Sequence, residues 1–280
     1  MTLIDSAAGI AVVRADLARL AAWLARPQRR PSEYSLANLY LYRERHGYRL
    51  VENPIPHLLG VTYDGERHAL PLAPLDDDGV AAMLLDSADC LFPLEQAEAE
   101  ALAGRLGLVI DWRDDDSDYL YDASHLARLD GAKPKRAQAR AFEEQTAPEL
   151  AELDKDAALA VLEGWLTDVG KSSQDTDFDE CREAIALGKE LGLSGYMTIV
   201  AREPVAFLLA GPSANGTRIV HFAKGRRAFA GAYPWMFARF AAICGAERLN
   251  FEQDLGKPGF AQAKRALAPV AQLRKYRVRR

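Results

Sequence analysis

Three strand-like segments follow one another with only short turns in the second half of the chain, and this order restricts the fold more than any other feature. Residues 195–201, 204–211 and 217–223 are rich in aliphatic, aromatic and β-branched side chains, and Asn215-Gly216 is a strong hairpin signal. Strands joined this closely are expected to pair as antiparallel neighbours. The segments that follow are a helix beginning near Pro234, a strand at 248–256, a helix at 258–267 and a closing strand at 272–278.

The first half predicts another layered region of helices and strands. Its predicted elements are helices near 10–25, 36–46 and 94–106, and strands at 48–51, 58–63, 68–72, 108–112 and 119–121. A length of 280 residues is more than one core usually fills. We therefore expect an α+β protein with two tandem domains, each a mixed sheet flanked by helices. The predicted ranges are 1–125, a basic helical bridge at 126–150, and 151–280 with the active cleft.

Composition excludes several classes of protein. A net charge of −5 argues against a protein that coats nucleic acid over its whole surface, although a local basic patch remains compatible with it. The three cysteines are far apart and show neither a disulfide framework nor zinc spacing, so we expect no metal site and a reducing, cytoplasmic location. No apolar run has the length of a bilayer span, which leaves peripheral contact as the expected form of any membrane association.

The segment Arg248–Gly256 is the first candidate site because its polar residues alternate with apolar ones. In a strand, this period of two would place Asn250, Glu252 and Asp254 on one face. Buried carboxylates need partners or a solvated cleft, so this row is unusual inside a domain. The alternative is that both carboxylates cap the next helix or pair with Arg248 and Lys264.

A basic loop before a predicted helix is the second candidate site. Lys224, Arg226 and Arg227 precede Gly231 and the helix that starts near Pro234, and free N–H groups at a helix N-terminus favour an anion. A solvated basic turn is the alternative reading of the same residues.

The order of elements resembles the Gcn5-related N-acetyltransferase (GNAT) fold, and the residues resemble the C-terminal domain of bacterial phosphatidylglycerol lysyltransferases. Asn38, within Leu36–Tyr42, is similar to that family's Asn-Leu motif. The matching residues include Tyr119, Tyr121, Lys135, Arg136, Phe222, Lys224, Gly231, Tyr233, Asn250, Glu252, Asp254, Gly256 and Lys264. The resemblance implies two GNAT-like domains and transfer of an acyl or aminoacyl group to an amine or hydroxyl. The donor would be an aminoacyl-tRNA or a coenzyme A thioester.

The resemblance also implies roles for individual residues. Glu252 or Asp254 would act as the general base or hold the attacking ammonium. Asn250, Lys264, Tyr233 and Asn38 would bind substrate. Lys224, Arg226, Arg227 and Gly231 would bind donor phosphates, and Lys135 and Arg136 of the bridge, with the tail Arg274–Arg280, would contact a tRNA backbone.

Some positions depart from the family pattern. The coenzyme A signature places Ala228 where a basic residue is usual, and alanines occupy positions 223, 261 and 266 where the family is polar. These alanines favour a competing class, a non-catalytic binding module of the same fold. His221, on the predicted strand before the basic loop, is expected to be a core histidine.

Overall fold

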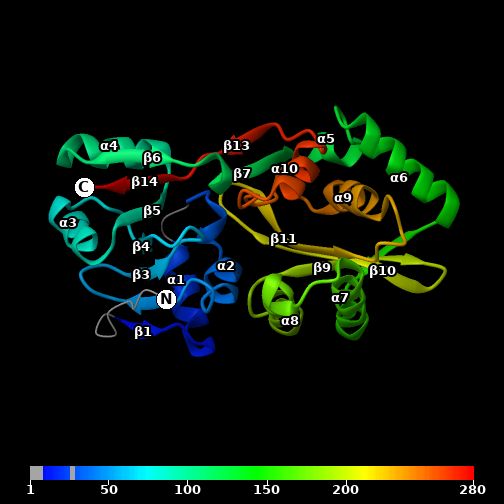
Figure 1. Cartoon of the computed structure of the whole chain (residues 1–280), viewed down its shortest axis with the longest axis horizontal. Helices are drawn as coiled ribbons and strands as arrows, with labels where there is room; N and C mark the ends of the chain where they lie inside the picture. The colour runs from blue at the N-terminus through cyan, green and yellow to red at the C-terminus, as the bar shows by residue number, and fades with distance from the viewer. Residues whose placement is uncertain (1–8, 26–28) are drawn as a thin grey trace. The chain divides into compact units, whose positions relative to one another are not determined.

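The computed structural model describes residues 9–25 and 29–280, and the chain divides into two compact units. The first unit contains the chain up to Asp118 together with Leu273–Arg280, and the second unit is Tyr119–Gln272. Each unit has a seven-stranded mixed sheet with helices against it (Figure 1). The predicted α+β class, with two mixed sheets flanked by helices, is confirmed.

The first sheet has the strand order β1-β2-β3-β4-β5-β14-β6. Its strands are β1 Ile10–Ala11, β2 Arg49–Val51, β3 His57–Val61, β4 Arg67–Pro71, β5 Cys90–Leu94, β6 Val109–Trp112 and β14 Tyr276–Arg279. The helices are α1 Leu17–Leu24, α2 Leu36–Leu41, α3 Asp78–Ser87 and α4 Gln96–Leu106. Only β4 and β5 pair in parallel among the described pairings of this sheet, because α3 supplies the crossover between them.

The second sheet has the strand order β13-β7-β12-β11-β10-β9-β8. Its strands are β7 Asp118–Asp122, β8 Glu149–Glu152, β9 Ser194–Val200, β10 Glu203–Pro212, β11 Thr217–Gly225, β12 Arg248–Asn250 and β13 Ala271–Leu273. The helices are α5 Ala123–Arg128, α6 Lys133–Thr146, α7 Lys155–Val169, α8 Phe178–Leu187, α9 Ala232–Ile243 and α10 Pro258–Arg265. The expected meander of β9, β10 and β11 is confirmed by its antiparallel pairings, and β12 then pairs with β11 in parallel.

Helices cover both faces of the second sheet. In Figure 1, α7 and α8 lie on one side of β9 and β10, and α9 lies on the other with α5 and α6. Phe142 of α6 meets Trp235 of α9 edge to face, with ring centroids 6.1 Å apart, and both side chains are buried. The basic segment predicted as a bridge at 126–150 therefore packs within the second unit.

The C-terminal segment differs most from the prediction. We expected a closing strand of the second half at 272–278, but the chain leaves the second sheet after β13 and inserts β14 between β5 and β6 of the first. Tyr276 and Val278 of β14 are buried in the core of the first unit. The pairing energy and apolar burial come from residues more than 160 positions away, so local sequence patterns did not indicate them.

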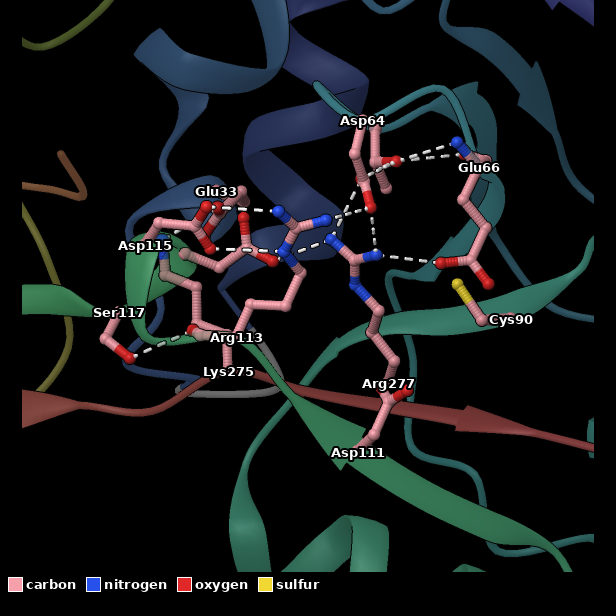
Figure 2. A network of polar contacts seen from close by, with 12 residues as sticks. Glu33, Asp64, Glu66, Cys90, Asp111, Arg113, Asp115, Ser117, Lys275 and Arg277 are labelled. Carbon is pink, nitrogen blue, oxygen red and sulfur yellow. Dashed lines mark hydrogen bonds and ion pairs between the residues drawn. The ribbon is translucent and has the colours of Figure 1, made fainter. Parts of the chain in front are cut away.

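Buried ion pairs hold this last strand in the first unit (Figure 2). The Lys275 ammonium is fully buried and lies 2.6 Å from Asp118 and 2.7 Å from Glu33. Arg277, only 3% exposed, pairs with three carboxylates from two segments: Asp64 and Glu66 in the turn between β3 and β4, and Asp116 before β7. Burial raises the pKa of Glu33 to about 7, against the opposing effect of Lys275.

Candidate functional site

The segment after β12 forms a polar turn instead of the longer alternating strand that we predicted. Regular pairing ends at Asn250, whose side-chain oxygen accepts a hydrogen bond from the backbone N–H of Glu252 at 2.7 Å. Asp254 accepts in the same way from the N–H of Gly256 at 2.9 Å. Short side chains of this type compete with the sheet for backbone donors, which explains why the strand prediction was wrong beyond Asn250. We call residues 250–256 the polar turn.

Glu252 is held in a backbone conformation that is uncommon for its residue type. Its φ is +57°, in the left-handed region that costs a side-chain-bearing residue free energy. Such outliers concentrate at functional sites, where the surrounding structure enforces them. The Glu252 side chain is 16% exposed, so its carboxylate is largely shielded but still reaches solvent.

His221 of β11 is the direct partner of Glu252. Its ring nitrogen Nδ1 lies 2.9 Å from Glu252 Oε1, and its side chain is only 1% exposed. Strand β11 lies beside β12, which explains how residues 31 positions apart meet. We predicted a core histidine, and His221 is indeed buried, but the sequence offered no signal of its contact with Glu252.

Asp254 has a different environment from Glu252. It is buried, and the hydroxyl of Tyr119 donates to its Oδ2 at 2.7 Å. Burial and this hydrogen bond raise the pKa of Tyr119. Asp254 thus connects Tyr119 of β7 to the polar turn, and it also accepts from the backbone N–H of Gly256. The following helix α10 begins after Lys257 and has no side-chain hydrogen bond at its N-cap, so Asp254 does not cap that helix, and its catalytic role stays a prediction.

Lys264 of α10 donates hydrogen bonds to the backbone of the polar turn. Its ammonium donates to the backbone carbonyls of Glu252 and Gln253, at 3.0 and 2.5 Å. The backbone carbonyl of Lys264 in turn accepts from the hydroxyl of Tyr121 at 2.7 Å. The structure therefore brings Asn250, Glu252, Asp254 and Lys264 together around one turn, with Lys264 oriented toward backbone oxygens.

Ion pairs engage the cations of the basic loop. The Lys224 ammonium lies 2.6 and 2.8 Å from the two Asp177 oxygens and 4.0 Å from the centre of the Trp165 ring. Arg226 pairs with Asp168 at 2.9 Å, and the same carboxylate accepts from the backbone N–H of Arg227. The hydrogen bond from Arg226 lowers the pKa of Asp168. The role of these cations as phosphate ligands stays a prediction.

Gly231 has a structural reason for being glycine. Its φ is +94°, and a Cβ at this position would lie 2.5 Å from the carbonyl oxygen of Gln138 in α6. A side chain would therefore push α6 away from the start of α9. The glycine serves the close approach of two helices, whether or not it also contacts a ligand.

The remaining predicted site residues have their partners outside the polar turn. The Tyr233 ring packs against Gly225, and burial raises the pKa of Tyr233. Asn38 lies in the first unit, where its side-chain amide donates to the Ser32 carbonyl at 2.8 Å. Both predicted site residues of the bridge are on α6, where Lys135 is half-buried and Arg136 is exposed and lies 3.8 Å from Asp130.

Four of the five basic residues in the predicted tail Arg274–Arg280 pair with carboxylates. Lys275 and Arg277 are buried and paired, and Arg279 and Arg280 pair with Asp111 and Asp86. Arg274 and Arg280 are exposed, so contact of the tail with a tRNA backbone stays a prediction.

Two further features are absent from the described residues. Residues 9–25 and 29–280 contain no group of three or more His, Cys, Asp or Glu side chains placed to hold a metal ion. In the same part of the chain, no helix is both long and apolar enough to span a membrane.

Comparisons with known proteins define the fold further. The chain matches the model of the family described as "Phosphatidylglycerol lysyltransferase, C-terminal" over residues 24–279. A search against curated proteins finds no match.

Solved structures show the same architecture. A conserved protein of unknown function from Bacteroides thetaiotaomicron has a TM-score of 0.83 at 23% identity, over 96% of this chain and 98% of that one. L-PGS from Bacillus licheniformis has a TM-score of 0.64 at 15% identity, over 99% of this chain and 94% of that one. At such identities the likeness establishes the fold alone.

Proposed function

This chain belongs to the phosphatidylglycerol lysyltransferase C-terminal family, and we propose that it transfers an aminoacyl group from an aminoacyl-tRNA to an amine or hydroxyl acceptor. The family expected from the sequence is thereby confirmed. The observation that carries the proposal is the Glu252 carboxylate, largely shielded from water, set on a left-handed turn and bonded to His221.

Glu252 would act as the general base of this reaction. The ionised carboxylate receives a proton from the acceptor, whose nitrogen or oxygen attacks the carbonyl carbon of the aminoacyl ester. The bond from this carbon to the tRNA ribose oxygen breaks, and this oxygen takes the proton from the Glu252 carboxyl and leaves as a hydroxyl, which returns Glu252 to its ionised form. Asn250 and Lys264 fix the backbone on either side of Glu252, so the base needs little rearrangement before it acts.

A coenzyme A thioester is the second candidate donor, and the basic loop weighs against it. Lys224 and Arg226 would have to leave Asp177 and Asp168 to bind a pyrophosphate. The N-terminus of α9 also meets α6 closely at Gly231. A non-catalytic module remains the competing class, on the alanines at 223, 261 and 266.

The donor can be tested directly. Lysyl-tRNA carrying labelled lysine is incubated with the protein and a cell extract as the source of acceptors, and acetyl coenzyme A is tested in parallel. We expect label to move from tRNA into a new product, and no comparable transfer of acetyl. Acetyl transfer alone would replace the proposed donor, and the absence of both transfers would favour the binding module.

Two cations near the start of α6 offer a test of tRNA binding. Replacing Lys135 and Arg136 with glutamine should reduce the slope of log affinity against log salt by about 0.7–0.9 for each phosphate that the protein no longer neutralises. The matched control is Arg140→Gln, since Arg140 is on the same helix and pairs with Glu144. An unchanged slope in the double variant would remove this end of α6 from the interface.

A further inference from the structure

We propose that His221 is a positioning residue for Glu252: a neutral imidazole, protonated on Nδ1, that holds the carboxylate ionised and in a fixed orientation. The claim about the protonation state of His221 depends only on the geometry around the ring. The claim that this orientation serves turnover rests on the proposed function.

The two ring nitrogens of His221 have opposite surroundings. Nδ1 is 2.9 Å from Glu252 Oε1, within hydrogen-bond distance. Nε2 is buried and has no hydrogen-bond partner among the described residues. It faces the backbone at Gly211, where a Cβ would lie 3.1 Å from Nε2 and 2.9 Å from a methyl of Leu193.

These surroundings distinguish the three forms of the ring. An imidazolium would bury an N–H at Nε2 with no acceptor, and a charged donor left unsatisfied is the costliest arrangement. The neutral form protonated on Nε2 has the same unpaired donor and also turns a lone pair toward the Glu252 oxygen. Only the form protonated on Nδ1 donates to Glu252 and leaves a lone pair, not a proton, in the apolar contact.

A neutral donor has a specific effect on Glu252. It orients one carboxylate oxygen without cancelling the negative charge, unlike the Lys275 ammonium beside Asp118. The Glu252 backbone is fixed separately, by Asn250 at its N–H and Lys264 at its carbonyl. Both the backbone and the side chain of Glu252 are therefore fixed. The carboxylate keeps the negative charge that a proton acceptor or an ammonium-binding group requires.

Nitrogen NMR tests the protonation state directly. A long-range ¹H–¹⁵N spectrum of the full-length ¹⁵N-labelled chain near neutral pH separates the two neutral tautomers and the imidazolium, and the His221 signals are assigned by their loss in His221→Asn. We expect the pattern of a neutral ring protonated on Nδ1. Protonation on Nε2, alone or together with Nδ1, would overturn the proposal.

Two variants test the coupling to Glu252. Glu252→Met removes the acceptor, so the His221 signals should no longer show Nδ1 protonation alone. Glu247→Gln is the matched control, because Glu247 is an exposed carboxylate three residues before Asn250, and it should leave the His221 signals unchanged. Unaltered signals in Glu252→Met would show that Glu252 does not set the tautomer.

The effect on turnover separates positioning from packing. If lysine transfer from lysyl-tRNA is found, His221→Leu should lower it by roughly tenfold to a hundredfold, the range expected when one hydrogen bond to a charged group is removed. His221→Asn should recover most of the rate, since an asparagine amide can donate from about the position of Nδ1. Equal rates in His221→Leu and the native chain would refute the positioning role, whereas absence of transfer in the native chain would refute the donor and leave the NMR result decisive.

Discussion

Both units bury carboxylates, but they compensate them in opposite ways. In the first unit, Asp118 is fully buried against the ammonium of Lys275, and Arg277 is surrounded by further carboxylates. In the second unit, Glu252 meets the ring of His221. Compensation by a full opposite charge is typical of a structural ion pair, whereas a shielded carboxylate with an uncharged donor retains its capacity to bind a proton or a cation.

The largest effect should follow from removing the cation of the structural pair. Lys275→Met leaves Asp118 and Glu33 buried without their counter-ion and should destabilise the protein by about 3–5 kcal/mol in urea unfolding. Adding Asp118→Asn should restore part of this stability, because it removes the uncompensated charge.

The control for this experiment is Arg140→Gln, which breaks an exposed pair with Glu144 and should change stability by less than about 0.5 kcal/mol. If Lys275→Met were as mild as Arg140→Gln, the charges around the last strand would not be what holds that strand in the first unit.

Buried histidines of the first unit predict a smaller, pH-dependent effect. Burial lowers the pKa of His68 to about 3, below the value of about 6.5 expected in the unfolded chain. Between these values the unfolded state binds the proton and the folded state does not. Stability should therefore fall as the pH drops below about 6.5, by up to about 1.4 kcal/mol per pH unit from this group.

His68→Phe isolates this contribution, since the ring of His68 already packs edge to face with Phe92 and Tyr48. In the variant, the unfolding free energy should depend less steeply on pH, with a slope smaller by up to about 1.4 kcal/mol per pH unit. An identical pH dependence in the two proteins would assign the acid sensitivity to other groups, of which buried His46 is the nearest candidate.

The smallest effect on stability should follow from removing the hydrogen bonds of Lys264 to the polar turn. Lys264→Met removes the hydrogen bonds to the carbonyls of Glu252 and Gln253 and should cost about 1 kcal/mol. Because it loosens the backbone of Glu252, it should lower lysine transfer by about tenfold. Lys257→Met changes an exposed residue at the start of the same helix and should alter neither stability nor lysine transfer. If the two variants had the same stability and the same transfer rate, the hydrogen bonds of Lys264 would not be what fixes the Glu252 backbone.

Local patterns predicted the elements better than their partners. The meander of β9 to β11 follows from strand-like segments and a hairpin signal, which act between near neighbours. The sheet that β14 joins could not be predicted in this way. In the sequence alone, Lys275 and Arg277 have the pattern of a solvated basic tail. Their partners Glu33, Asp64 and Asp118 are distant in sequence and meet them only in the folded chain.

The same limit applies to the site. The alternation around Asn250, Glu252 and Asp254 singled out the segment, although hydrogen bonds from its backbone to its own side chains end the strand at Asn250. His221 and Tyr119 complete it from other strands, at separations of 31 and 135 residues that no period reveals.

The most direct test of the contrast between the two kinds of carboxylate is Glu252→Gln, measured for lysine transfer from lysyl-tRNA and for urea unfolding on the same preparation. We predict a fall in turnover of about 10²–10⁴-fold, as for removal of a general base, with a change in stability below about 1 kcal/mol. Unchanged turnover, or a fall in stability of several kcal/mol, would place Glu252 with the structural carboxylates and contradict the proposed contrast.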